Sequence, residues 1–340
     1  MPVSRRATLA IPAAIVLAGY ATSSRAAESV RLGLLHTLSP APFYLAQEHG
    51  LWTAEGIGVE FRFFEAAQPI AAAAVSGDID VGVTALTGGF FSLAGKGALK
   101  VIGGAMHEQK GFELTAFVAS RKAYDAGLTD ISKMPGHSFG LTQYGSSFHY
   151  MMGRLAMARG FDIRSVTLRP LQTIGNMVAA VRTGQVDATM AIASMARPMI
   201  DAKQVVLLGW VGDEVPYQIT ALFTTAGMIR GRADALHRFC RGYQRGVAEY
   251  RGAFLRFGAD RKPIEGPSTD AAIAAITKYV FTGDPAAAAR IKAGIGWYDE
   301  GAALDVTDVR EQLAWFTAEA MVKGRIDPAD IIDTSFLPTR

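Results

Sequence analysis

Short apolar runs that fit β-strands alternate with helical stretches along most of the chain. Residues 30–35, 59–64 and 79–83 predict strands. Between them, residues 41–49 and 70–75 predict helices, the first entered through proline and closed by glycine. This alternation is typical of an α/β fold with largely parallel sheets.

The same order of elements recurs about 107 residues later. Gly33 is matched by Gly140, and the run Gly-Asp-Ile-Asp that ends at Asp80 is matched by Gly-Gln-Val-Asp ending at Asp187. Two further segments match at offsets of 107 and 105, namely residues 59–62 with 166–169 and residues 113–117 with 218–222. Turns from glycine to aspartate are common in α/β proteins, so one match would carry little, but four in one order indicate an internal duplication.

The duplication predicts two similar α/β lobes joined by a two-strand hinge, because each repeat ends in a strand that can cross to the other lobe. We expect lobe 1 to contain residues 27–116 and 221–340, and lobe 2 to contain residues 117–220. Strands at residues 113–120 and 218–225 would form the hinge. Later helices would cover lobe 1 and the hinge, at residues 232–257, 269–279, 285–293 and 306–322.

The first 26 residues have the three parts of a secretory signal peptide. A pair of arginines gives the positive start, residues 9–18 form an apolar run too short for a membrane helix, and residues 24–26 offer a cleavage site. The arginines fit either general secretion or the twin-arginine route. Tyr20 stands where a lipoprotein signal has cysteine, so we expect a periplasmic protein without a lipid anchor or stable membrane insertion.

Removing the predicted signal changes the charge balance. The whole chain has 34 Lys and Arg against 31 Asp and Glu, and the signal holds three Arg and no acid, so 31 of each sign remain. A formally neutral protein gives no reason to expect a nucleic acid or a membrane surface as partner. The single cysteine, Cys240, excludes an internal disulfide.

Five segments follow one another in an order that carries a family resemblance. They are residues 43–52 (FYLAQEHGLW), 77–84 (GDIDVGVT), 135–140 (PGHSFG), 145–150 (GSSFHY) and 184–188 (GQVDA). They resemble the nitrate/sulfonate/taurine-type substrate-binding proteins of ABC importers. The resemblance implies a periplasmic-binding-protein type II-like fold, a small-molecule ligand and the importer's permease subunits as partners; we expect a monomer with no cofactor and no metal. Residues 190–194 (MAIAS) replace a polar loop of many members, which favours a ligand with a larger apolar body.

Ligands of α/β sheets bind beyond the carboxyl ends of the strands. Six loops qualify, at residues 36–42, 65–69, 84–89, 143–149, 171–175 and 192–197. The sharpest candidate is the helix start Tyr144, Gly145, Ser146 and Ser147, because backbone N–H groups, two hydroxyls and the helix dipole could hold a carboxylate or sulfonate. The alternative is that one serine only caps the helix.

Other candidate ligand-binding residues lie on these loops or near the predicted hinge. Ser39, Thr84 and Ala85 could complete the polar site or belong to helix caps, and Gln68, His149 and Ser194 are further polar candidates. Phe43, Tyr144, Phe148 and Tyr217 could enclose a planar ligand or belong to the core. Arg197 could neutralise an acid or face solvent, and Glu113 could bind an amine, close the lobes or form a structural ion pair.

No enzyme motif is recognisable. The sequence has no His-Glu-x-x-His pattern, no Gly-x-Ser-x-Gly elbow and no Walker loop, and Cys240 lies in a predicted helix without catalytic context. We therefore expect a periplasmic binding protein, not an enzyme, that binds a small organic anion, a carboxylate or sulfonate that could be aromatic, by lobe closure. The alternatives are a neutral heterocycle such as a pyrimidine precursor, a signalling receptor, or an exported enzyme on the same fold.

Overall fold

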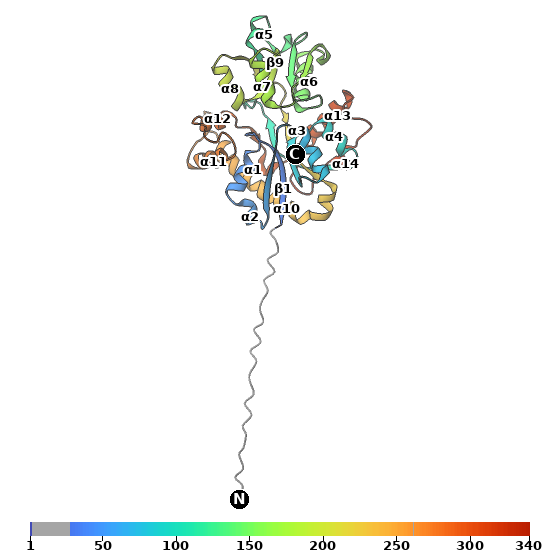
Figure 1. Cartoon of the computed structure of the whole chain (residues 1–340), viewed down its shortest axis with the longest axis vertical. Coiled ribbons are helices and arrows are strands. Elements are labelled where there is room, and N and C mark those ends of the chain that lie inside the picture. The colour runs from blue at the N-terminus through green and yellow to red at the C-terminus, as the bar shows by residue number, and fades with distance from the viewer. Residues whose placement is uncertain (2–27, 261) are drawn as a thin grey trace.

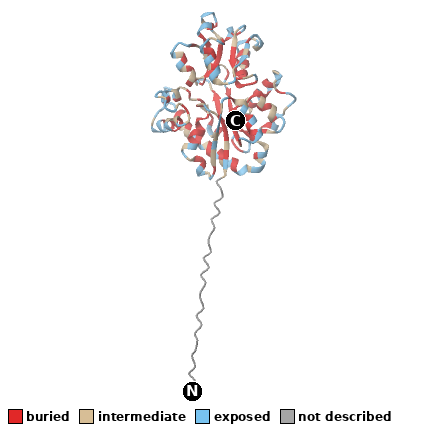
Figure 2. Ribbon diagram, in the orientation of Figure 1, coloured by how far each residue is buried: buried red, intermediate tan, exposed pale blue. Residues whose placement is uncertain are grey.

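The computed structural model describes Met1 and residues 28–260 and 262–340, so the predicted signal peptide lies outside the described residues. The chain forms two lobes, one above the other in Figure 1, and each is built on a mixed five-stranded sheet. In Figure 2 the buried residues gather on the central strands of each lobe. The predicted α/β class with C-terminal helices is confirmed.

Lobe 1, the lower body in Figure 1, has one strand that comes from much later in the chain. Its strands are β1 (Ser29–Leu35), β2 (Gly58–Phe64), β3 (Val81–Ala85), β4 (Leu99–Gly104) and β12 (Thr220–Thr225), in the order β2–β1–β3–β12–β4. β1 pairs in parallel with β2 and β3, whereas β12 lies antiparallel between β3 and β4. Its early helices are α1 (Ala41–Glu48), α2 (Leu51–Ala54), α3 (Ala67–Ser76) and α4 (Gly88–Ala94).

Lobe 2, the upper body, repeats this plan. Its strands are β6 (Thr115–Ser120), β7 (Ser138–Leu141), β8 (Thr167–Pro170), β9 (Ala188–Ile192) and β10 (Val205–Trp210), in the order β10–β6–β9–β7–β8. Here β6 is the antiparallel insertion, between β9 and β10. Its helices are α5 (Arg121–Asp125), α6 (Ser147–Arg159), α7 (Ile174–Arg182), α8 (Ala193–Asp201) and α9 (Val211–Glu214).

Two aspartates display the internal duplication. The carboxylate of Asp80 accepts the backbone N–H of Arg31 at 2.8 Å, and the carboxylate of Asp187 accepts the backbone N–H of Ser138 at 2.8 Å. The first bond connects the turn before β3 to the start of β1, and the second connects the turn before β9 to the start of β7. The predicted repeat is therefore present in hydrogen bonding as well as in sequence.

Two glycines leave room for side chains that lie over each sheet. A Cβ on Gly33 would lie 2.4 Å from Cδ1 of Ile79, and a Cβ on Gly140 would lie 2.9 Å from Cδ1 of Leu171. Real Cβ contacts are not this short, so both strands need glycine where side chains cross over them.

The chain crosses between the lobes twice. Most of each predicted hinge strand belongs to a lobe sheet, as β6 and β12, so the crossings are the segments before them, residues 109–114 and 215–216. A small sheet at the crossings has the order β11–β5–β13, from β11 (Tyr217–Gln218), β5 (Met106–Glu108) and β13 (Trp297–Tyr298). The two chain segments at the crossings are therefore joined by strand pairing as well as by the chain itself.

The C-terminal helices cover lobe 1 and touch lobe 2 on both flanks (Figure 1). They are α10 (Ala226–Phe254), α11 (Pro267–Thr277), α12 (Ala287–Ala293), α13 (Val306–Ala318) and α14 (Pro328–Ile331). Short 3₁₀ turns lie at Ile131–Lys133 and Ile163–Ser165 in lobe 2 and at Glu300–Ala302 before α13. α10 begins earlier than residue 232 and bends at Arg232. On one flank Trp315 covers Gly153 of α6; on the other, Arg290 donates to the carbonyl oxygen of Ser194 at 3.3 Å.

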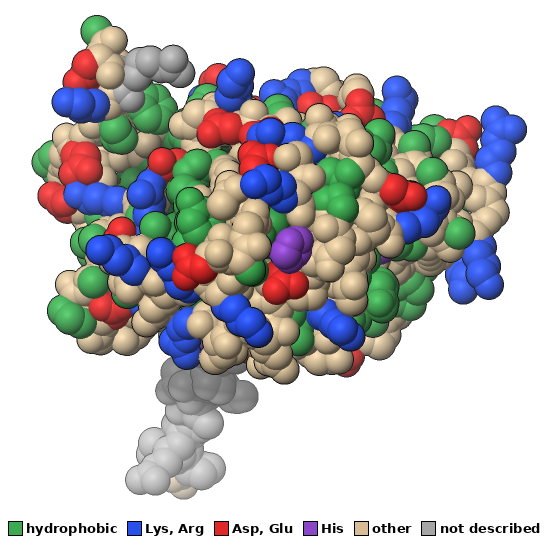
Figure 3. All heavy atoms as spheres, turned by 90° about the horizontal axis from the view of Figure 1, so that it is seen from above, with side chains coloured by type: hydrophobic (Ala, Val, Ile, Leu, Met, Phe, Trp, Pro, Cys, Tyr) green, Lys and Arg blue, Asp and Glu red, His purple; other side chains and the backbone are tan. Residues whose placement is uncertain are grey.

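The surface carries charges of both signs. On the face seen in Figure 3, Lys and Arg are interspersed with Asp and Glu, and no large patch of one sign forms. Among the described residues, no helix combines the length and apolar character needed to span a membrane.

Candidate functional site

A small cavity, the interlobe cleft, lies where the carboxyl ends of strands from both sheets meet. All six loops chosen from the sequence contribute to its wall, which consists of Leu35, Thr37, Ser39, Ala66, Ala67, Thr84, Ala85, Met106, Thr115, Thr142, Gln143, Ser146, Ser147, Phe148, Ile174, Ile192, Ile219 and Thr220. Its volume is about 60 Å³. Small-molecule sites usually measure about 300–1,000 Å³, so the lobes must separate to admit an organic ligand.

The start of α6 forms the lobe 2 side of the cleft. Ser146 caps the helix, because its hydroxyl accepts the backbone N–H of His149 at 3.4 Å, so the capping alternative holds for this serine. Ser147, in the first turn, is not the cap, and its side chain lines the cleft. Gly145 adopts a left-handed conformation with φ 77° and donates its N–H to Nδ1 of His149 at 3.1 Å.

His149 does not line the cleft; instead it hydrogen bonds to the loop that precedes α6. Its imidazole is buried, and burial lowers its pKa to about 4. At neutral pH the ring is therefore uncharged, and Nδ1 is free to accept the N–H of Gly145. His149 thus fixes the backbone turn that exposes Ser147.

Lobe 1 presents hydroxyl groups opposite α6. Thr84 is 2% exposed, lines the cleft beside Ala85, and its Oγ1 has no hydrogen-bond partner within the described structure. Ser39 hydrogen bonds to Thr37 at 2.9 Å between their hydroxyl oxygens, and it does not cap α1. For Thr84 and Ser39, unlike Ser146, helix capping is therefore not the explanation.

Two hydrogen bonds hold the lobes together across the cleft. Nε2 of Gln143 donates to Oε1 of Gln68 at 2.5 Å, and the backbone N–H of Gly88 donates to the carbonyl oxygen of Gly145 at 2.9 Å. Gln68 therefore lies at the closure contact. The small cavity and these bonds describe a closed conformation.

Of the four aromatic candidates, Phe148 lines the cleft, and the other three lie away from its wall. Phe43 is fully buried and stacks on Tyr243 of α10 with ring centroids 4.2 Å apart, so the core alternative is correct for it. Tyr217 is also buried, against Tyr150, and its hydroxyl has no partner in the described structure. Tyr144 is 59% exposed and is not among the residues that line the cleft.

Three polar candidates lie on the flank between lobe 2 and the C-terminal helices. Arg197 forms an ion pair with Glu113, and its guanidinium lies 5.2 Å from the ring centroid of Trp210. Ser194 is buried next to α12, with its carbonyl oxygen bonded to Arg290. None of the three lines the interlobe cleft, and the structural ion pair is the alternative that holds for Glu113.

Several lining residues were not singled out from the sequence. Thr142 and Gln143 follow β7, whereas Thr115 and Thr220 begin the two strands that enter a lobe after a crossing. Hydroxyl and amide side chains at strand ends were the available signal. Their convergence depends on how the lobes meet, which no local pattern contains.

The cleft wall contains hydroxyl, amide and apolar side chains, and none of its residues is charged. Within residues 28–260 and 262–340, no group of three His, Cys, Asp or Glu side chains could hold a metal ion. Cys240 is buried in α10, and burial raises the pKa of its thiol to about 12, which makes it a poor nucleophile.

Comparisons with known proteins agree with this geometry. A family model described as NMT1-like family matches residues 24–227. No curated protein sequence matches the chain.

Three solved structures share the fold. The alkanesulfonate-binding protein SsuA from Xanthomonas axonopodis pv. citri, bound to MOPS, is 17% identical, with a TM-score of 0.71 over 91% of this chain and 100% of that one. The periplasmic aliphatic sulphonate binding protein SsuA from Escherichia coli is 16% identical, with a TM-score of 0.69 over 90% and 92%. The periplasmic nitrate-binding protein NrtA from Synechocystis PCC 6803 is 11% identical, with a TM-score of 0.56 over 91% and 92%. These matches confirm the resemblance and the periplasmic binding protein fold expected from the sequence motifs.

Proposed function

The chain belongs to the NMT1-like family, and we propose that it is a periplasmic solute-binding protein of an ABC importer whose ligand is a small organic anion, a sulfonate or carboxylate. The observation that carries this proposal is the unpartnered hydroxyl of Thr84, which lines the cleft that also contains Ser147. An unpaired buried hydroxyl costs free energy unless a ligand supplies its partner.

An anion in this cleft would be held without a cationic side chain. The first residues of three helices line the cavity: Ala67 of α3, Ser147 of α6 and Ile174 of α7. Their free backbone N–H groups and the positive ends of the helix dipoles favour negative charge. Hydroxyl groups from both lobes add donors that rotate to suit the ligand.

The body of the ligand would contact apolar side chains. Leu35, Phe148 and Ile192 line the cleft together with Ile174 and Ile219. This lining supports an organic sulfonate or carboxylate with an apolar body over an inorganic anion, in agreement with the Met-Ala-Ile-Ala-Ser segment. The sulfonate-binding relatives make sulfonates the first class to test.

Closure would couple the two lobes to the bound ligand. A ligand held by α6 of lobe 2 and by Thr84 of lobe 1 favours the closed state by its extra contacts there. The loops that carry Gln143 and Gln68, and those that carry Gly88 and Gly145, would approach each other again as the lobes close on the ligand. We propose that the importer's permease recognises this closed form of a monomer.

The compartment and the lobe boundaries belong to the same proposal. Residues 1–26 would act as a signal peptide that directs the chain to the periplasm. The division into residues 27–116 with 221–340, and residues 117–220, would define the moving bodies.

A thermal-shift screen of aliphatic sulfonates, aromatic sulfonates, carboxylates and neutral heterocycles tests the ligand class. Ligand at 100 times its dissociation constant adds about 2.7 kcal/mol of stability, which such a screen detects. The uncharged lining favours one alternative, a neutral heterocycle. Shifts from heterocycles alone would reject the anion, and turnover of any compound would reject a binding protein.

A further inference from the structure

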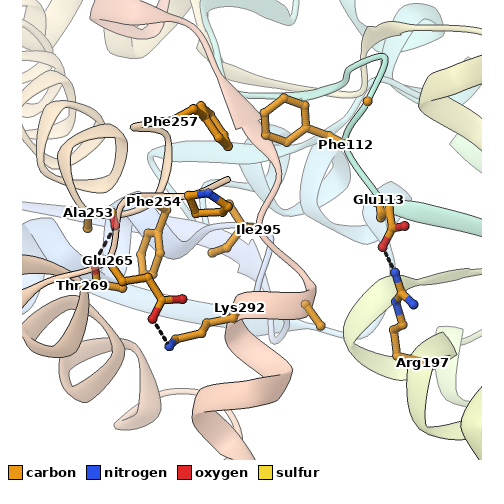
Figure 4. Close-up of a pocket in the computed structure, with 13 residues that line it drawn as sticks. Phe112, Glu113, Arg197, Ala253, Phe254, Phe257, Glu265, Thr269, Lys292 and Ile295 are labelled. Atoms are coloured by element: carbon orange, nitrogen blue, oxygen red, sulfur yellow. Dashed lines mark hydrogen bonds and ion pairs between the residues drawn. The ribbon is translucent and has the colours of Figure 1, made fainter. Parts of the chain in front are cut away.

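A second cavity, here called the hinge-flank cavity, lies beside the first crossing (Figure 4). Residues 111–113 of the crossing form one side, and the ends of α10 and α12 form the other. Its volume is about 390 Å³, within the range of small-molecule sites. It shares no lining residue with the interlobe cleft.

One wall of the hinge-flank cavity is aromatic. Phe112 and Phe257 meet edge to face with ring centroids 5.8 Å apart, and Phe254 of α10 also lines the cavity. Phe257 is 40% exposed. Empty space beside these aromatic rings, one of them exposed, favours a ligand with an aromatic body.

The rest of the cavity lining contains two ion pairs, and the first is formed by residues of the C-terminal segment. Lys292 of α12 pairs with Glu265, and Figure 4 shows the two side chains pointing toward each other. Both are well exposed, at 39% and 52% of their side-chain surface. Exposed ion pairs contribute little to stability, so a ligand can replace this one at small cost.

We propose that the hinge-flank cavity binds a zwitterion with an aromatic body, of which an aromatic α-amino acid is the simplest example. The ligand carboxylate would take the place of Glu265 beside Lys292, its ammonium group would bind Glu265, and its ring would lie against Phe254 and Phe257. A ligand with one charge would leave either Lys292 or Glu265 without its partner. A zwitterion pairs both, so the charge pattern selects it.

The second ion pair connects this site to lobe 2. Arg197 of α8 reaches Glu113 on the crossing, and both residues line the same cavity. The hinge-flank cavity is therefore bounded by both lobes and by a segment that joins them. This proposal concerns a separate site and does not depend on the ligand proposed for the interlobe cleft.

Isothermal titration of the mature chain with L-phenylalanine tests the site. We expect a dissociation constant of about 1 mM or lower, as ordinary ligand efficiency gives for a molecule of this size. Three probes each lack one element: 3-phenylpropionate has no ammonium group, phenethylamine has no carboxylate, and L-alanine has no ring. Each should bind at least tenfold more weakly. Binding of L-phenylalanine that is absent at about 10 mM, or is matched by a singly charged probe, would overturn the proposal.

Matched variants locate the binding. Phe257→Ala and Lys292→Gln should each weaken L-phenylalanine at least tenfold, and because both side chains are partly exposed their melting temperatures should stay close to that of the parent. Thr84→Val, in the interlobe cleft, should leave this affinity unchanged. The opposite pattern, loss in Thr84→Val with both other variants unaffected, would assign L-phenylalanine to the interlobe cleft and reject the second site.

Discussion

Replacing Thr84 with valine separates the two effects that a buried hydroxyl can have. Thr84 is 2% exposed in β3, and its Oγ1 has no partner in the described structure. Leaving such a group unpaired costs about 1–3 kcal/mol, and valine has nearly the same shape. We expect Thr84→Val to raise the free energy of unfolding of the unliganded protein by up to about 1 kcal/mol.

The same substitution should weaken ligand binding. A hydrogen bond to a charged group contributes about 1.5–3 kcal/mol, whereas one to a neutral group contributes about 0.5–1.5 kcal/mol. The expected loss of affinity is therefore roughly 10- to 150-fold for a sulfonate or carboxylate and roughly 2- to 10-fold for a neutral heterocycle. The size of the loss thus reports the charge of the ligand.

Thr224→Val is the matched control in the same sheet. Thr224 is fully buried in β12, and its hydroxyl donates to the carbonyl oxygen of Asp80 at 2.6 Å. This variant should lose about 1–2 kcal/mol of stability with unchanged affinity. Urea unfolding gives the stabilities, and titration with the tightest compound of the thermal screen gives the affinities. If Thr84→Val lost stability as Thr224→Val does and kept its affinity, the hydroxyl would not be a ligand donor.

Three further outcomes follow from the described contacts. Ser146→Ala should lower the free energy of unfolding by about 1 kcal/mol because it removes a helix cap, whereas Ser147→Ala should mainly weaken binding; titration and urea unfolding of both variants would expose a reversed pattern. Burial raises the pKa of Glu108 from 4.5 to about 7, so its contribution to stability falls as pH rises from 4.5 to 7. Burial lowers the pKa of His149 from 6.5 to about 4, so its contribution to stability is lost as pH falls from 6.5 to 4. Glu108→Gln and His149→Gln should therefore remove opposite slopes from urea unfolding between pH 4 and 7, and equal slopes would contradict both assignments. Gly33→Ala should cost about 1–3 kcal/mol in urea unfolding because its Cβ would lie 2.4 Å from a neighbouring side chain; a neutral effect would show that the helix layer can shift.

The loops around the cleft could be predicted from the sequence because strand ends determine them. Parallel strands carry their loops to the same edge of a sheet, so the pattern that locates strands also locates the loops. Of the pair that joins the lobes, Gln68 was a predicted site residue and Gln143 was not, because their contact depends on how the two lobes come together. Glu113 and Arg197 were each considered separately, and their ion pair, across more than 80 residues, was not apparent.

Phe43 shows why three of the four aromatic candidates were misplaced. It stands in the first turn of α1, on a loop that does reach the cleft, so its position alone favours a ligand contact. Its ring instead stacks on Tyr243, which comes 200 residues later in α10. Burial of an aromatic side chain against a distant helix stabilises the core and leaves no local signal.

The insertion of β12 between β3 and β4 has a consequence for the time at which the chain can fold. Thr220 pairs with Ala85, so the middle of the lobe 1 sheet is incomplete until residue 225 is available. Pairing over such separations is slow, and until then β3 and β4 expose open edges to other chains. The topology therefore favours completion of the lobe 1 sheet only after the strands of lobe 2 have been synthesised.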